Sequence, residues 1–315
     1  MSKIAFVFPG QGSQSVGMCK EFYDTYPVVK QIFEEADDAL GFSLTKLCFE
    51  GPDDQLRLTY NTQPAILTAS TACAAVLKEH GLKCDVAAGH SLGEYSALVN
   101  AGAMSFADAV RTVRKRGQFM QEAVPVGEGS MAAVLGLASE KIVEICRSIE
   151  AEGGEAVQAV NFNCPGQVVI AGAVNAVNKA CEALKEAGAK RCIPLSVSAP
   201  FHSTLMQPAS VRLAEVLDGF TINDAAFPVV ANVTAAEVVA GATIKELLVK
   251  QAAMPVLWET SVRNMVANGV DTFVEVGPGK VLTGFTKKIA KGLPALNVED
   301  PASLEKTLAH FQEEK

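Results

Sequence analysis

The pentapeptide GHSLG at residues 89–93 is the segment of this chain with the clearest chemical potential, because it has the form G-x-S-x-G. It follows a short apolar run at residues 86–88 and precedes a helical segment that begins at Glu94. A serine in so tight a strand-to-helix turn needs small neighbours, and the helix start directs free N–H groups toward its hydroxyl. The pattern predicts a nucleophile elbow with Ser91 as nucleophile. The alternative is a glycine-rich turn without chemistry.

A serine nucleophile needs a general base, and the chain has four histidines. His80 ends a predicted helix and His310 lies in a charged C-terminal helix, so both are expected at the surface. His90 precedes the serine and is expected to point to the opposite side as a packing group. His202 remains, in the segment SAPFHS at residues 198–203, where a cleft between two units is expected. Elimination favours His202 as the base. The alternative is that His202 only packs in the interface between the two units.

A glycine-rich loop, FPGQGSQ at residues 8–14, follows the first apolar run. Its glycines do not match G-x-G-x-x-G, so a dinucleotide site is not predicted. In a hydrolase-type site such a loop donates one backbone N–H to an oxyanion, and the residue after the nucleophile donates the other. These donors would be Gln11 and Leu92. A second loop, GPGK at residues 277–280, is followed by Val281 where a phosphate loop has Ser or Thr, so no phosphate site is predicted.

Four basic residues lie within six positions of a predicted helix, namely Arg111, Arg114, Lys115 and Arg116. A helix cannot expose all four equally, so one is expected to face inward. An inward guanidinium in an apolar cleft would bind a carboxylate through two parallel hydrogen bonds. Arg116 is the candidate for this role, and the other three are expected to be solvated.

Composition limits the class of protein. The 315 residues suggest about two domains, and 49% hydrophobic with 20% charged residues excludes a disordered chain. The net charge of −8 argues against nucleic acid or an anionic membrane as a non-specific partner. The N-terminal apolar run is too short for a signal peptide, and no run is long enough to span a bilayer. The eight cysteines form neither C-x-x-C nor zinc spacings, so we expect a soluble cytoplasmic protein without a metal.

The chain shows two different patterns of predicted strands and helices. In the outer parts, short apolar runs alternate with segments of helical period, which predicts a wound parallel α/β sheet. The expected strands are 4–8, 86–88, 229–233 and 272–276, and the expected helices include 63–80, 106–122 and 258–268.

The middle part predicts the order β-α-β-β-α-β of a ferredoxin-like unit. Its central strands are joined by the turn CPG at residues 164–166. We therefore expect a small domain at residues 126–198, inserted into a large domain formed by residues 1–125 and 199–315. The expected strands are 131–137, 157–163, 167–171 and 191–197, and the expected helices are 139–151 and 174–187.

Together these segments resemble the malonyl-CoA:acyl carrier protein transacylases of fatty-acid synthesis, which are related to polyketide acyltransferase domains. The resemblance covers nearly the whole chain in family order. It implies an α/β-hydrolase-like parallel-sheet core with an inserted ferredoxin-like (α+β) subdomain. Further matching segments are RGQFMQ at 116–121, NFNCPGQVVIAG at 161–172, LVKQ ending at Gln251, and EVGPGKVLTG at 275–284.

The resemblance also implies catalytic roles. Ser91 would be the acylated nucleophile, His202 the base, and Gln11 and Leu92 the oxyanion donors. The backbone carbonyl of Gln251 would orient the histidine, where a Ser-His-Asp hydrolase has an acid. No compelling acid stands out in this sequence.

For the substrate, the resemblance implies that Arg116 binds the malonyl carboxylate. Met120 and Asn161 would line the pocket, together with Gln11 and Leu92. Phe201 and Leu92 are similar to the residues of malonyl-selective enzymes, in which a bulky ring would crowd an α-methyl group.

The implied reaction moves malonyl from malonyl-CoA to Ser91 and then to the phosphopantetheine thiol of acyl carrier protein. No other cofactor is implied, because CoA and the carrier bring the phosphopantetheine themselves. Acyl carrier proteins are acidic, so a basic docking rim is expected at Lys190, Arg191, Lys287 and Lys288. Three alternatives stay open: a serine thioesterase or hydrolase, a binding-only relative, and an acyltransferase that serves polyketide assembly.

Overall fold

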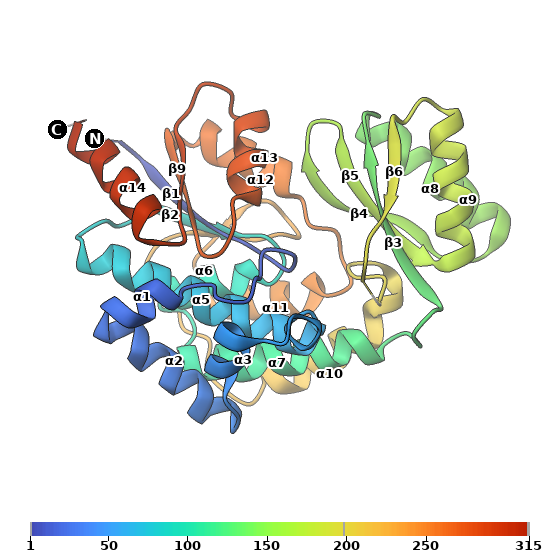
Figure 1. Ribbon diagram of the computed structural model, residues 1–315. Helices are drawn as coiled ribbons and strands as arrows, with labels where there is room; N and C mark the ends of the chain where they lie inside the picture. The colour runs from blue at the N-terminus through green and yellow to red at the C-terminus, as the bar shows by residue number, and fades with distance from the viewer. Residues whose placement is uncertain (1, 198, 314–315) are drawn as a thin grey trace.

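The computed structural model describes residues 2–197 and 199–313, and its strands form two separate sheets (Figure 1). Ser198, with which the predicted inserted domain ends, lies outside the described residues. The boundaries at residues 126 and 198 therefore stay a prediction. Within the described part of the chain, no helix combines the length and the hydropathy that crossing a bilayer requires.

The larger sheet consists of β1 (Ile4–Phe8), β2 (Val86–Gly89), β7 (Val229–Val230), β8 (Glu237–Val238), β9 (Thr272–Val276) and β10 (Ala295–Val298). Its order is β10-β9-β1-β2-β7-β8, and all neighbours run parallel except the edge pair β7 and β8. Phe8 pairs with Gly89 at the carboxyl ends of β1 and β2, so the loops that follow these strands lie side by side. Ligand sites of open α/β sheets form at this edge.

Helices cover both faces of the larger sheet, as Figure 1 shows. They are α1 (Lys20–Thr25), α2 (Pro27–Leu40), α3 (Leu44–Glu50), α4 (Asp53–Leu56), α5 (Thr59–Glu79), α6 (Gly93–Asn100), α7 (Phe106–Glu122), α10 (Gln207–Leu217), α11 (Gly241–Gln251), α12 (Trp258–Ala267), α13 (Val281–Ile289) and α14 (Pro301–Glu313), with a short 3-10 helix at Thr204–Met206.

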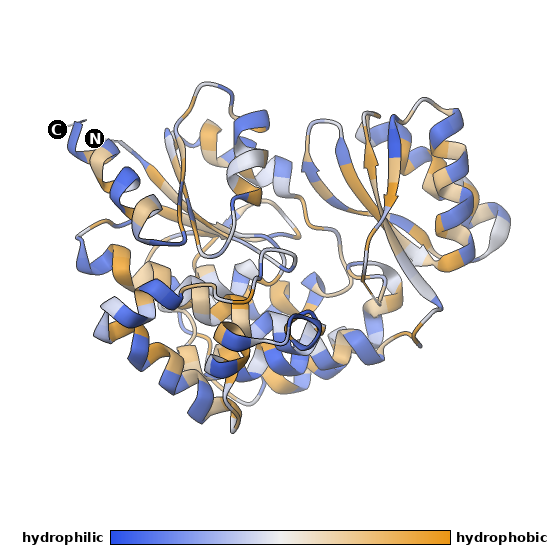
Figure 2. Cartoon of the chain, in the orientation of Figure 1, coloured by the Kyte–Doolittle hydropathy of each residue, from blue (hydrophilic) through white to orange (hydrophobic). Residues whose placement is uncertain are grey.

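The two-residue period of a strand builds two apolar layers from this sheet. Phe6 and Phe8 of β1 pack into the cluster that includes α2, α5 and α7, whereas Ala5 and Val7 pack into the cluster of α12 and α13. Hydrophobic residues accordingly lie along the strands and the inward helix faces, with hydrophilic residues outside (Figure 2). A sheet that is buried on both faces leaves its carboxyl edge as the place for a site.

The smaller sheet is antiparallel, with the order β4-β5-β3-β6 of a ferredoxin-like unit. One face packs on its two helices, and the other face, through Met131, Val160 and Val169, packs toward Met120 and Phe201 of the larger unit. The predicted α/β fold class is confirmed. The elements are β3 (Gly129–Leu135), α8 (Ser139–Gly153), β4 (Val157–Cys164), β5 (Gln167–Ala173), α9 (Val174–Glu186) and β6 (Arg191–Pro194).

Several predicted elements have different limits, such as the strand expected over residues 131–137, which spans Gly129–Leu135. Three of the differences have a local reason. The strand expected to reach residue 197 ends at Pro194, which has no N–H for the ladder. The helix expected from Gln63 begins at Thr59 and contains Pro64. Because proline has no N–H to donate to the carbonyl of Tyr60, that carbonyl accepts from Arg114 Nη1 at 2.8 Å.

The strand expected over residues 229–233 stops at Val230. Beyond it, Asn232 turns its side chain to the serine elbow, and this takes the chain out of the ladder. The sequence did not predict β8 or β10, which are short strands at the two edges of the sheet.

Candidate active site

The turn between β2 and α6 has the close contacts of a nucleophile elbow. Ser91 has φ of +51°, a backbone conformation that non-glycine residues rarely adopt. A Cβ on Gly89 would lie 1.8 Å from the backbone carbon of Gly93, and a Cβ on Gly93 would lie 2.1 Å from the carbonyl oxygen of Phe8. Both flanking positions must therefore be glycine for the serine to reach this position.

Asn232, which sequence reasoning missed, holds this turn from the neighbouring segment after β7. The backbone N–H of Ser91 donates to Asn232 Oδ1 at 2.7 Å, and Asn232 Nδ2 donates to the carbonyl of Gly89 at 2.6 Å. Asn232 is 1% exposed, so both bonds are protected from water. The strained serine is thus fixed by a side chain from a distant part of the chain.

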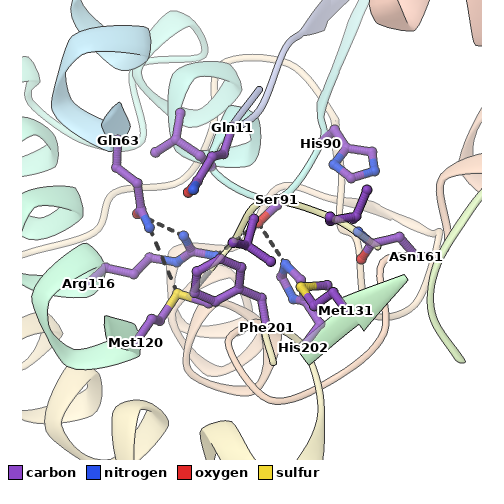
Figure 3. Close-up of a pocket in the computed structure, with 13 residues that line it drawn as sticks. Gln11, Gln63, His90, Ser91, Arg116, Met120, Met131, Asn161, Phe201 and His202 are labelled. Carbon is purple, nitrogen blue, oxygen red and sulfur yellow. Dashed lines mark hydrogen bonds between the residues drawn. The ribbon is translucent and has the colours of Figure 1, made fainter. Parts of the chain in front are cut away.

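His202 lies against the serine hydroxyl, as elimination predicted. Its Nε2 is 2.8 Å from Ser91 Oγ (Figure 3). Its Nδ1 is 2.8 Å from the backbone carbonyl of Gln251. A carbonyl can only accept, so Nδ1 must carry the proton and Nε2 must present its lone pair to the serine. The hydroxyl therefore donates to a nitrogen that is ready to take its proton.

The environment of His202 keeps the imidazole neutral. Burial, and then the charge of Arg116, lower the pKa of His202 to about 3. The ring is 3% exposed and its residue has φ of +62°, so the surrounding structure fixes its orientation. A neutral imidazole at physiological pH is the form that a general base needs.

Arg116 is the inward basic residue that the helix pattern predicted. It is 1% exposed, whereas Arg111 and Lys115 are exposed and Arg114 lies partly buried. Its Nη2 donates to Ser91 Oγ at 3.1 Å. Two glutamine side chains accept its other bonds: Gln63 Oε1 from Nη1 at 2.8 Å and Gln251 Oε1 from Nη2 at 2.9 Å.

Gln63 is a second residue that sequence reasoning missed. It is buried on α5, and besides Arg116 it contacts Met120 Sδ at 3.9 Å. Burial lowers the pKa of Arg116, and the nearby Tyr95 and Glu94 oppose this change. The guanidinium is thus a positive charge at the serine hydroxyl, surrounded by neutral amide oxygens.

The predicted oxyanion donors lie on the adjoining loops after β1 and β2. The Gln11 side chain donates to Thr59 Oγ1 at 3.2 Å, which anchors the first loop. Within residues 2–197 and 199–313, the backbone amides of Gln11 and Leu92 donate to no protein atom. Since a Cβ on Gly10 would lie 2.4 Å from the carbonyl oxygen of His90, the two loops are in close backbone contact. Two N–H groups near one serine can hold a developing oxyanion.

The serine opens into a cavity of about 110 Å³ between the two sheets. Its apolar wall includes Met120, Met131 and Phe201, and Asn161 adds a polar group. A neighbouring cavity of about 280 Å³ also includes Gln11 and Asn161 and extends between β5 and α13. The structure therefore brings every predicted catalytic and pocket residue to one place.

The other three histidines fit the predictions less uniformly. His90 packs on Trp258 with ring centres 5.7 Å apart, as a packing group should, and its Nε2 lies 2.8 Å from Asn163 Oδ1. However, its ring also lines both cavities, so the expectation that it points away from the site is wrong. Side chains at the carboxyl edge of the sheet are more crowded than the alternation of side chains along a strand suggests. His80 is exposed as expected, whereas His310 is partly buried.

No group of three or more metal-ligating side chains occurs among the described residues. The eight cysteines carry free thiols, including Cys19 and Cys73, whose sulfur atoms lie 3.5 Å apart in the core.

A serine on an elbow, bonded to a neutral histidine and touched by a buried guanidinium, is an arrangement suited to acyl transfer. Comparison with known families makes this specific. The family model described as acyl transferase domain matches residues 5–307, and the chain belongs to this family.

Individual relatives match nearly the whole chain. It is 53% identical over 314 residues to the malonyl CoA-acyl carrier protein transacylase of Bacillus subtilis (strain 168), which covers 100% of this chain and 99% of the relative. An acyl carrier protein S-malonyltransferase from Vibrio cholerae O1 biovar eltor has a TM-score of 0.95 at 49% identity, covering 97% of this chain and 100% of that one. A malonyl-transacylase solved with its holo type II PKS acyl-carrier protein has a TM-score of 0.95 at 47% identity, covering 98% and 100%.

Proposed function

We propose that this protein transfers the malonyl group of malonyl-CoA to the phosphopantetheine thiol of acyl carrier protein, through an ester on Ser91, and so supplies fatty-acid chain elongation. The observation that carries the proposal is the contact of Arg116 Nη2 with Ser91 Oγ at 3.1 Å. An acyl group attached to this serine would place its far end beside a buried cation. Malonyl has a carboxylate there, and acetyl does not.

In the first half-reaction, the Ser91 hydroxyl gives its proton to His202 Nε2 while Oγ bonds to the thioester carbon. The N–H groups of Gln11 and Leu92 hold the resulting oxyanion, a contribution of about 3–4 kcal/mol per donor in comparable sites. The carbon–sulfur bond then breaks, and His202 gives the proton to the sulfur of CoA. The Gln251 carbonyl stabilises the imidazolium through its bond to Nδ1.

In the second half-reaction, the carrier thiol gives its proton to His202 and its sulfur attacks the ester carbon. The bond to Ser91 Oγ breaks, and the serine recovers the proton from His202. Each half-reaction ends with the histidine neutral, the form that its lowered pKa favours. No cofactor of the enzyme itself is needed, and we propose a cytoplasmic location, where the acceptor thiol stays reduced.

Arg116 binds the malonyl carboxylate in this proposal. Its five N–H groups allow a bidentate pair with the carboxylate while one of the two glutamine bonds is kept. Met120 and Phe201 give the pocket an apolar wall beside the acyl group. A branch on the acyl chain would meet this wall, although one methyl group changes binding by only about 1–3 kcal/mol.

We further propose that Lys190, Arg191, Lys287 and Lys288 form the docking rim for the acidic carrier. All four are exposed. Lys288 and Lys190 flank the turn between β4 and β5. Lys288 lies near enough to Cys164, at the end of β4, for its charge to oppose the rise in the pKa of that thiol that burial causes. Lys190 packs on Gly136, and the N–H of Gly136 donates to the carbonyl of Gly166 in the turn at 2.8 Å.

Charge reversal tests this rim. Lys287→Glu with Lys288→Glu should raise KM for the carrier and flatten its salt dependence, because long-range attraction mainly speeds association. Lys30→Glu on α2 is the matched control and should leave both unchanged. Unaltered carrier kinetics in the double variant at low salt would remove these residues from the rim.

The proposed function is tested by following label from malonyl-CoA into holo acyl carrier protein, free acid and enzyme. The proposal requires transfer to the carrier, much slower release of malonate, and weak use of acetyl-CoA. Rapid release of malonate without transfer would identify a thioesterase instead. Comparison of fatty-acid and polyketide carriers as acceptors distinguishes the two pathways.

A further inference from the structure

Glu94 is a buried carboxylate that the reaction described above does not use. It lies in the first turn of α6, three residues after the serine, and is 3% exposed. Its Oε2 accepts from Gln251 Nε2 at 2.8 Å and from the backbone N–H of Asn232 at 3.0 Å. A carboxylate in such a place is costly unless it has partners, so these contacts explain how it is tolerated.

The two donors to Glu94 hold the two halves of the reacting pair. Asn232 fixes the turn that carries Ser91, through the bonds to the elbow backbone. Gln251 offers its carbonyl to His202 Nδ1, and its Nε2 also donates to the carbonyl of Ser91 at 2.9 Å. One carboxylate oxygen therefore ties the position of the nucleophile to that of the base.

Glu94 also balances charge. Arg116 is buried, and within the described residues no carboxylate lies within ion-pair distance of it. Arg116 Nη2 donates to Gln251 Oε1 at 2.9 Å, and the same amide donates from Nε2 to Glu94. The amide of Gln251 thus bridges a cation and an anion that do not touch.

We infer that Glu94 takes the place of a triad acid without touching the histidine. It is a positioning residue that acts through Gln251, and it offsets the positive charges of Arg116 and of the imidazolium formed during transfer. The inference rests on the proposed function. Without this anion, the described residues would offer no negative charge beside the protonated His202 and Arg116, and the substrate's carboxylate and oxyanion alone would balance the two cations. The loss would therefore appear in the step in which the histidine takes the proton.

Few ionisable groups surround Glu94, so its own titration should be visible. Arg116 on α7 and Tyr95 on its own helix face it, and the strands β1, β2 and β7 that pack on α6 contain no ionisable side chain. On α5, Cys73 pairs with Cys19 in the core, Tyr60 stacks on Arg114, and Lys78 and Glu79 are exposed.

The sign of the pH effect follows from the charge. Burial raises the pKa of Glu94 to about 7, although its hydrogen bonds and Arg116 oppose the increase. As pH falls through about 7, the carboxylate gains a proton and the anion is lost, so acylation should slow. His202 titrates near pH 3 and cannot cause this change.

The experiment measures the first half-reaction alone, as the single-turnover rate of CoA release from malonyl-CoA, between about pH 5 and 9. This excludes the carrier thiol, which titrates in the same range. Glu94→Gln should slow the reaction at pH 8 by about 10- to 100-fold, less than the loss of a directly bonded triad acid. It should also abolish the acidic limb near pH 7. Glu94→Asp keeps the charge and should retain the limb at a reduced rate.

Glu275→Gln is the matched control, because Glu275 is equally buried, also has its pKa raised to about 7, and faces α13 instead of the serine. It should keep the wild-type acidic limb. The inference is overturned if Glu94→Gln keeps the wild-type rate and limb, if Glu94→Asp loses the limb, or if the control changes it equally. A wild-type protein that forms no ester refutes the proposed function itself, which is a different result.

Discussion

Two strand–turn–helix units of the same sheet have the same order of elements, but their buried carboxylates have different roles. One runs from β2 through the serine turn into α6, and the other runs from β9 through residues 277–280 into α13. Both follow parallel strands, both are rich in glycine, and both contain a buried carboxylate with a pKa raised to about 7. The difference lies in where each carboxylate points.

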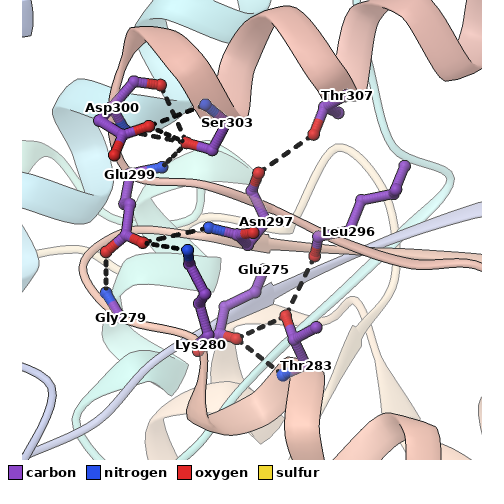
Figure 4. Close-up of polar contacts among 10 residues, drawn as sticks. All are labelled: Glu275, Gly279, Lys280, Thr283, Leu296, Asn297, Glu299, Asp300, Ser303 and Thr307. Atoms are coloured by element: carbon purple, nitrogen blue, oxygen red, sulfur yellow. Dashed lines mark hydrogen bonds and ion pairs between the residues drawn. The ribbon is translucent and has the colours of Figure 1, made fainter.

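In the second unit the carboxylates occupy the helix start (Figure 4). Glu275 accepts from the N–H groups of Leu282 and Thr283 at 3.1 and 2.7 Å and from the Thr283 hydroxyl, while Glu299 accepts from the N–H of Gly279 at 2.7 Å. The positive end of α13 is therefore neutralised within the protein. These contacts argue against an anion site at the GPGK loop.

In the first unit the carboxylate leaves the helix start open. Glu94 turns to Gln251 and Asn232, and the N–H of Leu92 keeps no protein partner among the described residues. A helix start can stabilise a substrate anion only if its own side chains do not occupy it. The comparison indicates that unoccupied donors, rather than glycine-rich turns alone, mark a candidate site.

The largest expected effect separates the two turns by function. Ser91→Ala should reduce malonyl transfer by at least about 10⁴-fold, because it removes the nucleophile. Thr283→Ala in the second turn should lower the melting temperature through the lost bond to Glu275, and it should retain transfer. Transfer assays and thermal unfolding of both variants check this. Strong loss of transfer in Thr283→Ala would remove the distinction.

The next effect concerns the cation of the first unit. Arg116→Ala should weaken malonyl transfer by about 2–5 kcal/mol, as for a truncated buried charge pair, and acetyl transfer far less. It should also raise the ratio of hydrolysis to transfer, since the carboxylate no longer fixes the ester. Arg114→Ala, two residues away and stacked on Phe42 and Tyr60, is the control. Equal loss for both substrates would contradict the assignment of Arg116.

Glycine substitutions should sharpen the contrast in packing. A Cβ on Gly89 would meet backbone at 1.8 Å, so Gly89→Ala should destabilise the protein by about 3 kcal/mol or more. Gly279 has φ of +86° with its nearest neighbour at 3.4 Å, so Gly279→Ala should cost only the left-handed strain, about 1–2 kcal/mol. Urea unfolding measures both values. Similar values for the two variants would show that the turns are equally tight.

The last effect is a pH dependence of stability at the second unit. Burial raises the pKa of Glu275 from its ordinary 4.5 to about 7, so between these values the folded protein holds a proton that the unfolded chain has lost. The stabilisation is present below pH 4.5 and disappears as pH rises through 7. The unfolding free energy of wild type minus that of Glu275→Gln should therefore fall by up to about 3 kcal/mol across this range. Urea unfolding at several pH values checks it, and a constant difference would contradict it.

The sequence predicted those parts of the site that rest on scarce residue types or on strict local geometry. Four histidines allow elimination, and the elbow requires glycine at fixed spacing, so His202 and Ser91 could be found. The basic cluster predicted that one of its four residues faces inward, and the resemblance to a known family implied the role of Arg116. The α/β alternation and the inserted antiparallel unit followed from strand and helix periods.

The residues that were missed are common types whose role depends on distant partners. Asn232 bonds to the backbone of Ser91 across 141 positions, and Gln63 meets Arg116 across 53. Glu94 had one local signal, since it is the single charged residue of an otherwise apolar or small helix. Edge strands of two to four residues were missed because they bury too little apolar surface to produce a pattern.

The most direct test of the account is peptide mapping of the purified protein after brief exposure to labelled malonyl-CoA. The account predicts one malonyl ester, on the peptide that contains Ser91, and its complete discharge on addition of holo acyl carrier protein. Label on another residue, or an ester on Ser91 that water removes as fast as the carrier thiol does, would contradict it.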